Sequence, residues 1–290
     1  MFLRIVSIVF PIFIIVMVGF AYGRKRRPDM AAANTLNITV FLPALFFSAL
    51  AGKTFNLADN AQIALGCAVV VLGSGLLAWP LARALGFQPK TLVPPVMFNN
   101  AGNMGLPLLA LAFGEQALGA AVVLMLVETL LQFSLGTRLL GDRLRLSMVW
   151  REPVFAAAIL GMAVSLSGFV VWAPIMTASK LLGDISIGLM IFSLGVRLSS
   201  ASLGSWTIGW VGAVATPLTG MLVAWAYGLL VGLSRSEQDI LFVFGALPPA
   251  VVNFIFAERY QQEPEKVASI VIIGNAASVI FIPLALALRF

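Results

Sequence analysis

Three asparagines, two glycines and a proline are concentrated in one short stretch of an otherwise apolar segment. The stretch reads Asn-Asn-Ala-Gly-Asn-Met-Gly-Leu-Pro from Asn99 to Pro107. Pro107 has no backbone N–H and leaves the carbonyl of Asn103 without its helical donor, while glycines let the backbone leave helical geometry. Irregular backbone is tolerated at bilayer depth only where it is buried in protein or lines a wet cavity. We therefore interpret an interrupted helix as part of a transport site, with the candidate residues Asn99, Asn100, Gly102, Asn103, Gly105 and Pro107.

A second interruption is predicted in the other half of the chain. Pro248 and Pro249 stand about 141 positions after Pro107, inside another apolar segment. Pro248 leaves the carbonyl of Phe244 without a helical donor. Interruptions at matching places in two halves of a chain are a pointer to a transporter's binding site. We add Pro248, Pro249 and Asn253 to the candidate site. Asn253, one turn beyond Pro249, either faces the same cavity or caps the second half-helix.

The asparagines suit recognition of an anion. Amides donate and accept hydrogen bonds, and half-helix N-termini that meet at a crossing direct positive dipole ends toward negative charge. We place no Arg or Lys within the membrane, so amides, dipoles and backbone N–H groups would bind the anion. The alternative is structural, because amides also hold helices together while Gly102 and Gly105 permit close packing.

Glu128 is the acid placed deepest in a predicted span. A carboxyl group in apolar surroundings favours its neutral form, and an intramembrane ionisable residue is a functional candidate. Glu128 either exchanges a proton during transport or is a neutral acid bonded to a neighbouring helix. Two further coupling candidates are Asn275, at the corresponding place in the last predicted helix, and Asp184, near the outer end of another. Coupling to protons or to sodium is left open.

Composition restricts the chain to a membrane protein. It is 60% hydrophobic and 10% charged, with a mean hydropathy of +1.01, whereas soluble domains carry about 25% charged residues. The formal charge of +6 resides in short loops between apolar runs, which is typical of orientation signals rather than of nucleic-acid binding. With no histidine and the single cysteine Cys67, we expect no metal or cofactor. No nucleophile–base pair is present in the sequence, which argues against an intramembrane enzyme.

Apolar runs predict ten transmembrane helices, because one helical crossing needs about 20 apolar residues. The first five runs fall approximately at 3–22, 31–50, 61–82, 92–113 and 117–136. The second five fall at 153–169, 174–197, 206–231, 238–257 and 267–288.

The loops between these runs predict the orientation. With the N-terminus outside, 13 Lys and Arg residues lie on the inner side and 5 on the outer side, as the positive-inside rule requires. The most basic inner loop divides the chain into five helices and five, so the second half would be inverted. We therefore predict a first repeat over 1–137, a basic cytoplasmic linker over 138–152 and an inverted second repeat over 153–290. Both termini would lie on the non-cytoplasmic side.

The stretch from Asn99 to Pro107 resembles the signature of the auxin efflux carrier family. The runs Ala246-Leu-Pro-Pro-Ala-Val-Val-Asn253 and Ser278-Val-Ile-Phe-Ile-Pro283 are similar to later parts of the same family. That family includes plant auxin exporters and bacterial carriers linked to malonate, malate and other small organic acids. The resemblance implies a ten-helix fold like that of sodium–bile-acid symporters, with inverted five-helix repeats and helices 4 and 9 crossing at prolines. It also implies a scaffold of helices 1, 2, 6 and 7 beside a moving core.

We expect a secondary carrier that moves a small organic anion, such as a dicarboxylate or an auxin-like acid, across the inner membrane by alternating access. A passive anion channel is the alternative, and an intramembrane enzyme is less favoured. The expected partners are the substrate and the lipid bilayer, without nucleic acid. A homodimer is left open.

Overall fold

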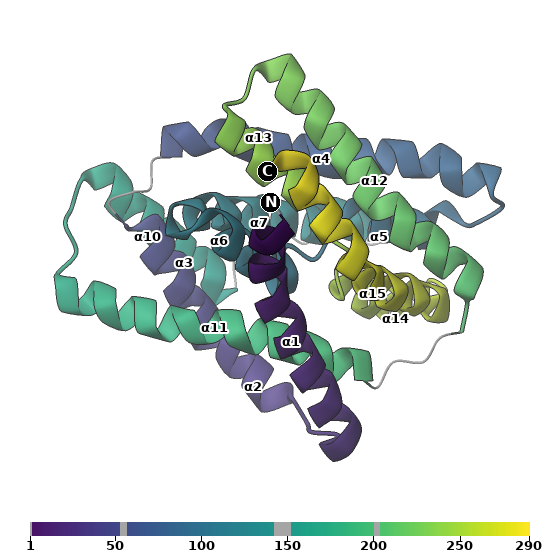
Figure 1. The fold of residues 1–290 in the computed structure, drawn as a ribbon, viewed down its shortest axis with the longest axis horizontal. Helices are drawn as coiled ribbons and strands as arrows, with labels where there is room; N and C mark the ends of the chain where they lie inside the picture. The colour runs from purple at the N-terminus through teal and green to yellow at the C-terminus, as the bar shows by residue number, and fades with distance from the viewer. Residues whose placement is uncertain (1, 53–56, 142–151, 200–203) are drawn as a thin grey trace.

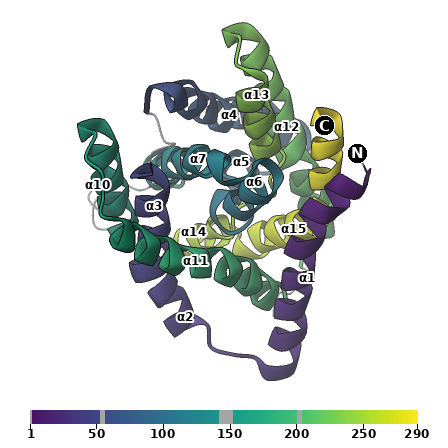
Figure 2. The same cartoon turned by 60° about the vertical axis from the view of Figure 1, so that its left-hand side comes forward.

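The structure is a computed structural model that describes residues 2–52, 57–141, 152–199 and 204–290. Over these ranges the chain forms helices joined by loops, and an isolated β-bridge joins Asn99 and Pro249 (Figures 1 and 2). The prediction of an all-α membrane protein is confirmed at this level. Residues 142–151 of the predicted linker, and Lys53, lie outside the described ranges.

Seven helical runs in the described ranges are long and apolar enough to cross a bilayer, and each coincides with a predicted span. Five are single α-helices: α1 (Phe2–Arg26), α4 (Leu57–Ala84), α11 (Ala173–Ser199), α12 (Trp206–Val231) and α15 (Pro264–Arg289). The other two contain π-helical turns. One joins α2 (Ala31–Leu36), η1 (Asn37–Phe41) and α3 (Leu42–Leu50), and the other joins η3 (Glu115–Ala117), α7 (Leu118–Leu131), η4 (Gln132–Gly136) and α8 (Thr137–Leu139). A shorter apolar helix, α10 (Pro153–Ser167), occupies the predicted span 153–169.

The remaining two predicted spans are interrupted helices. α5 (Pro89–Met97) ends at Phe98, whose backbone is extended with φ −105° and ψ 104°. A helix resumes with the π-helical η2 (Ala101–Gly105) and α6 (Leu106–Phe113). In the second half, α13 (Arg235–Gly245) ends before the two prolines and α14 (Val252–Arg259) follows them. The predicted interruption at Pro248 and Pro249 is therefore present.

The prediction that Pro107 marks the first interruption is wrong. Pro107 lies inside the helical run Ala101–Phe113, directly after the π-helical η2, and does not end it. The helix breaks several residues earlier, at 98–100, because the backbone there pairs with the second interruption.

The helices pack as two groups. In the first group, α1 packs against α11, and α3 packs against α10 and α11. In the second group, α12 packs against α4, α5, α13 and α15, and α4 packs against α7. Figures 1 and 2 show α1, α3 and α11 on one side of the interrupted helices and α4 and α12 on the other. The candidate site lies between the two groups.

Glycines let α1 and α11 approach to backbone contact. A Cβ atom added at Gly195 would overlap the carbonyl oxygen of Val16, and one added at Gly19 would overlap that of Phe192. A Cβ atom at Gly188, on the same helix as Gly195, would have no heavy atom within 4 Å.

Gly195→Ala is expected to lower the free energy of unfolding by about 1–3 kcal/mol, because overpacking forces backbones apart. The midpoint of thermal unfolding in detergent, followed by tryptophan fluorescence, measures this effect. Gly188→Ala is the matched control and should leave the midpoint unchanged or slightly raised, since alanine favours a helix more than glycine does. Equal midpoints for the two variants would contradict the close contact of α1 with α11.

The two chain termini lie side by side (Figures 1 and 2). The guanidinium carbon of Arg4 is 4.1 Å from the centroid of the Phe290 ring, a cation–π distance. The start of α1 and the C-terminal end of α15 therefore lie at the same end of the bundle.

Candidate functional site

The two interruptions cross and pair through their backbones. The backbone N–H of Asn100 donates to the carbonyl of Pro248 over 2.7 Å, and that of Ala250 donates to the carbonyl of Phe98 over 3.0 Å. Together they form the antiparallel bridge centred on Asn99 and Pro249. Two short extended segments inside the protein thus satisfy each other's backbone groups, as buried backbone requires.

Asparagine side chains give two carbonyls at the interruptions a second donor, beside the backbone N–H groups of Leu247 and Ala250. Asn99 Nδ2 donates over 2.9 Å to the carbonyl of Phe244, whose helical donor is removed by Pro248. Asn253 Nδ2 donates over 2.8 Å to the carbonyl of Phe98. These side chains therefore bond the two crossing segments together, which is the structural alternative set out above. Asn253 bonds carbonyl oxygens and does not cap the N–H groups of α14.

Asn275 on α15 joins the same network. Its Nδ2 donates to the carbonyl of Pro249 over 3.0 Å, and its Oδ1 accepts from Asn100 Nδ2 over 3.0 Å. Asn275 is 3% exposed. It therefore connects both interruptions to a continuous helix.

A cavity of about 270 Å³ adjoins the crossing, and we call it the central cavity. Its walls come from α2, η1, α3 and α11 on one side, and from residues 99–103, α7, the start of η4, residues 250–252 and Ile255 on the other. Its volume is near the lower end for small-molecule sites. Its polar lining includes the side chains of Asn34, Asn37, Asn100, Asn103, Thr129 and Gln132.

Three π-helical turns supply polar residues to this cavity. Asn37 is the first residue of η1, Asn103 lies in η2 and Gln132 is the first residue of η4. Single π turns are frequent at functional sites. Asn37 accepts a hydrogen bond from Ser186, and Gln132 donates one to Asn253. Asn103 is half-buried and lines the cavity beside Gly102.

Two buried groups at the cavity have oxygens without hydrogen-bond donors among the described residues. They are both carboxyl oxygens of Glu128 and the Oδ1 atom of Asn99. Glu128 is 2% exposed and lines the central cavity. A buried acceptor without a donor is costly. These oxygens can accept a hydrogen bond from a donor group or bind a cation.

Arg197, which we counted among the residues of the inner side, also lines the central cavity, so a guanidinium adjoins the amides there. It stands in the last turn of α11, whose apolar run extends through it. Ser186, Met190, Ser193 and Arg197 are spaced by four, three and four residues, which places them on one helix face. This periodicity is the signal in the sequence that points to the face, and the hydrogen bond from Ser186 to Asn37 shows in the structure that the face is turned toward η1.

The other predicted site residues lie behind or away from the cavity. Gly105 packs against the crossing, since an added Cβ would lie 2.6 Å from Leu247 Cδ1. Asp184 is exposed on α11, thirteen residues or about 20 Å along the helix from Arg197. The structure does not bring Asp184 to the site. The remaining predicted residues do not line the cavity: Gly105, Pro107, Pro248, Pro249, Asn253 and Asn275.

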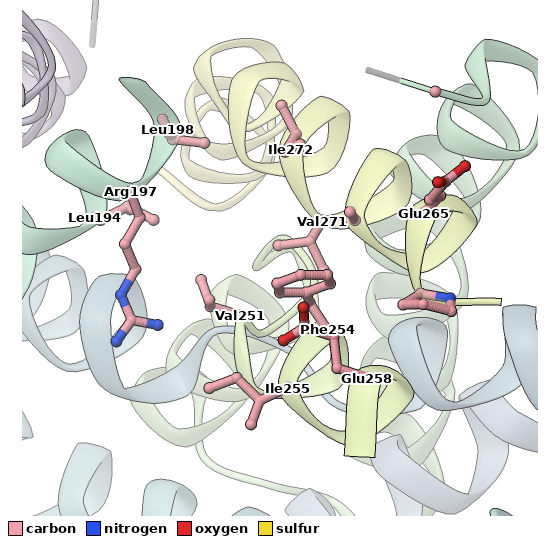
Figure 3. Close-up of a pocket in the computed structure, with 13 residues that line it drawn as sticks. Leu194, Arg197, Leu198, Val251, Phe254, Ile255, Glu258, Glu265, Val271 and Ile272 are labelled. Carbon is pink, nitrogen blue, oxygen red and sulfur yellow. The ribbon is translucent and has the colours of Figure 1, made fainter. Parts of the chain in front are cut away.

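A larger pocket of about 730 Å³ adjoins the central cavity, and we call it the vestibule. It lies between the end of α11, helix α14 and the first half of α15 (Figure 3). Leu194, Leu198, Phe254, Val271 and Ile272 make most of its wall apolar. Its charged lining residues are Arg197, Glu258 and Glu265.

Sequence comparison identifies the family of the chain. A family model described as Membrane transport protein matches residues 4–149 and 144–286. An uncharacterized transporter of Methanocaldococcus jannaschii is 22% identical over 299 residues, covering 96% of each chain. An uncharacterized transporter of Methanothermobacter thermautotrophicus is 24% identical over 298 residues, covering 95% of each chain.

Plant proteins are similar over part of the chain. Auxin efflux carrier component 2 of Arabidopsis thaliana is 33% identical over 144 residues, which is 46% of this chain and 22% of the plant protein. This likeness and the family match confirm the resemblance to auxin efflux carriers. They also identify a transport protein rather than an enzyme.

Proposed function

We propose that this chain, which belongs to the family described as Membrane transport protein, is a secondary carrier that moves a small organic anion by alternating access. The observation that carries the proposal is the central cavity, which combines polar amides with one arginine between two packing groups of helices. Movement of one group against the other would expose such a cavity to each side in turn. The first group would be the scaffold, and the second, which holds the crossing, would move.

Ten membrane crossings in two inverted repeats account for the number of helices and for the position of the chain ends. Chain ends that lie together imply an even number of crossings. Seven long helices, the shorter α10 and the two interrupted helices make ten. The repeats would be 1–137 and 153–290, each with its interrupted helix in fourth place. Together with the charge asymmetry of the loops, this supports outer termini in an inner-membrane protein and a vestibule that opens to the cytoplasm.

The lining of the cavity supports an anionic substrate of small size. Amides and a guanidinium bind carboxylates, and about 270 Å³ suits a small organic acid. Dicarboxylates and auxin-like acids are the classes to test. Coupling would involve a proton on Glu128, with sodium as the alternative.

Asn103→Ala tests this function. The side chain lines the cavity, and a hydrogen bond to a charged group is worth about 1.5–3 kcal/mol. The variant should therefore bind its substrate about ten- to a hundredfold more weakly, with an unchanged melting midpoint. Purified protein would be titrated with radiolabelled malonate, malate and indole-3-acetate, at matched protein amounts.

Counterflow distinguishes a carrier from a passive channel. Proteoliposomes loaded with the unlabelled probe should transiently concentrate the labelled probe if a carrier exchanges them. Flux that does not saturate and shows no counterflow would favour the channel. If Asn103→Ala binds the probe as tightly as the wild type, the amides of the cavity have a structural role and do not bind the substrate.

A further inference from the structure

The central cavity and the vestibule meet at three residues that line both. They are Arg197 on α11, Val251 just before α14 and Ile255 within α14. α11 belongs to the first packing group and α14 adjoins α15 in the second. The junction therefore lies where the two groups face each other.

Arg197 is the only Lys or Arg among the described residues that line either pocket. Its two neighbours at the junction are apolar, as is most of the vestibule wall. Figure 3 shows the guanidinium of Arg197 on the side of Val251 and Ile255, the carboxylate of Glu258 pointing into the middle of the pocket, and Glu265 on the far side. Both vestibule glutamates are on exposed residues, where water screens their charges. Arg197 is the one charged residue of the three that line both pockets, and a guanidinium beside the apolar Val251 and Ile255 gives the junction a positive potential.

We propose that Arg197 forms a second anion-binding position at the junction. It receives the carboxylate of the substrate between the vestibule and the amides around Asn103. A guanidinium can bind a carboxylate through two parallel hydrogen bonds, so an anion leaving water exchanges its hydration for Arg197 before it reaches the amides. The substrate's part in this step rests on the proposed function. The positive potential at the junction does not depend on the proposed function.

Cysteine reactivity measures the potential without any substrate. Ile255 is 44% exposed and lines both pockets, so Ile255→Cys in a Cys67→Ala background places one thiol at the junction. The ratio of its labelling rates with a sulfonate-bearing and a trimethylammonium-bearing methanethiosulfonate reports the local charge. Arg197→Gln should lower this ratio about tenfold, and Arg197→Lys should largely retain it. Arg259→Gln is the matched control, because Arg259 is on α14 but lines neither pocket.

A second measurement tests whether the substrate uses this position. Arg197→Gln should weaken binding of whichever radiolabelled probe binds the wild type (malonate, malate or indole-3-acetate) by about tenfold. Arg259→Gln should leave binding unchanged. A labelling ratio that Arg197→Gln leaves unchanged would overturn the inference. Unchanged substrate binding by Arg197→Gln, while Asn103→Ala binds weakly, would overturn it as well, and both results leave the proposed function intact. Wild-type protein that binds none of the probes, with the labelling ratio still dependent on Arg197, would count against the proposed function and support the anion position.

Discussion

Asn275→Ala should lower the free energy of unfolding by about 2–4 kcal/mol, because it leaves two buried polar groups without partners. The carbonyl of Pro249 loses its donor, and Asn100 Nδ2 loses its acceptor. Because all three residues are buried or at the crossing, water reaches them poorly. The melting midpoint in detergent should fall clearly, and transport should fall with it as the interrupted helices lose their common support.

Asn103→Ala is the matched comparison for this prediction. It is the same chemical change at the same crossing, but at a side chain that faces the central cavity. It should lower binding and leave the midpoint in place, whereas Asn275→Ala should lower the midpoint first. If the melting midpoint of Asn275→Ala equals that of the wild type, the network of amides does not hold the crossing together.

The interruption at Pro248 was predictable because proline acts locally. A missing N–H deprives the carbonyl four residues earlier of its donor whatever the tertiary structure. The sequence therefore identifies the carbonyl of Phe244 as one that loses its donor four residues on. The backbone N–H of Leu247 replaces that donor locally, but the second donor, Asn99, is 145 positions away in the chain, and no local rule selects it.

The position of the first interruption was not predictable from proline alone. Pro107 lies within the helical run Ala101–Phe113 without ending it, and the break at 98–100 is determined by backbone pairing with residues 248–250. A pairing between distant segments overrides local propensity. The same reason explains why Asn99 and Asn253 bond carbonyls at the crossing, although their residue type suits a ligand equally well.

The cavity residues that the sequence analysis missed were missed for two other reasons. Asn37 and Gln132 lie in π-helical turns, and a π turn rotates the face that a helix presents without any signature in hydrophobic periodicity. Arg197 stands at a helix end, where a basic residue is ordinarily an orientation signal. Only the packing of α11 across the crossing brings it to the cavity.

Glu128 is the buried acid at this crossing, and its two oxygens have no donor among the described residues. An ionised carboxylate without partners is costly in such a place, whereas a protonated one carries its own donor. Asn99 Oδ1, which also lacks a donor, lines the same cavity. The conformation described therefore suits the neutral acid, and a conformation that admits water would suit the carboxylate. Protonation would then alternate with the opening of the cavity.

Glu128→Gln keeps a neutral group with a donor in this place and removes the exchangeable proton. In proteoliposomes with a clamped membrane potential, a gradient of one pH unit and one proton per substrate can drive at most about tenfold accumulation, since each tenfold ratio is about 1.4 kcal/mol. Wild-type protein should approach that ratio, and Glu128→Gln should stay near a ratio of one while exchange of labelled for unlabelled substrate persists. Glu115→Gln, the same change at an exposed glutamate paired with Lys180, should behave as the wild type. Gradient-driven accumulation that survives Glu128→Gln with unaltered pH dependence would exclude Glu128 from coupling, and an imposed sodium gradient would then be the next driving force to test.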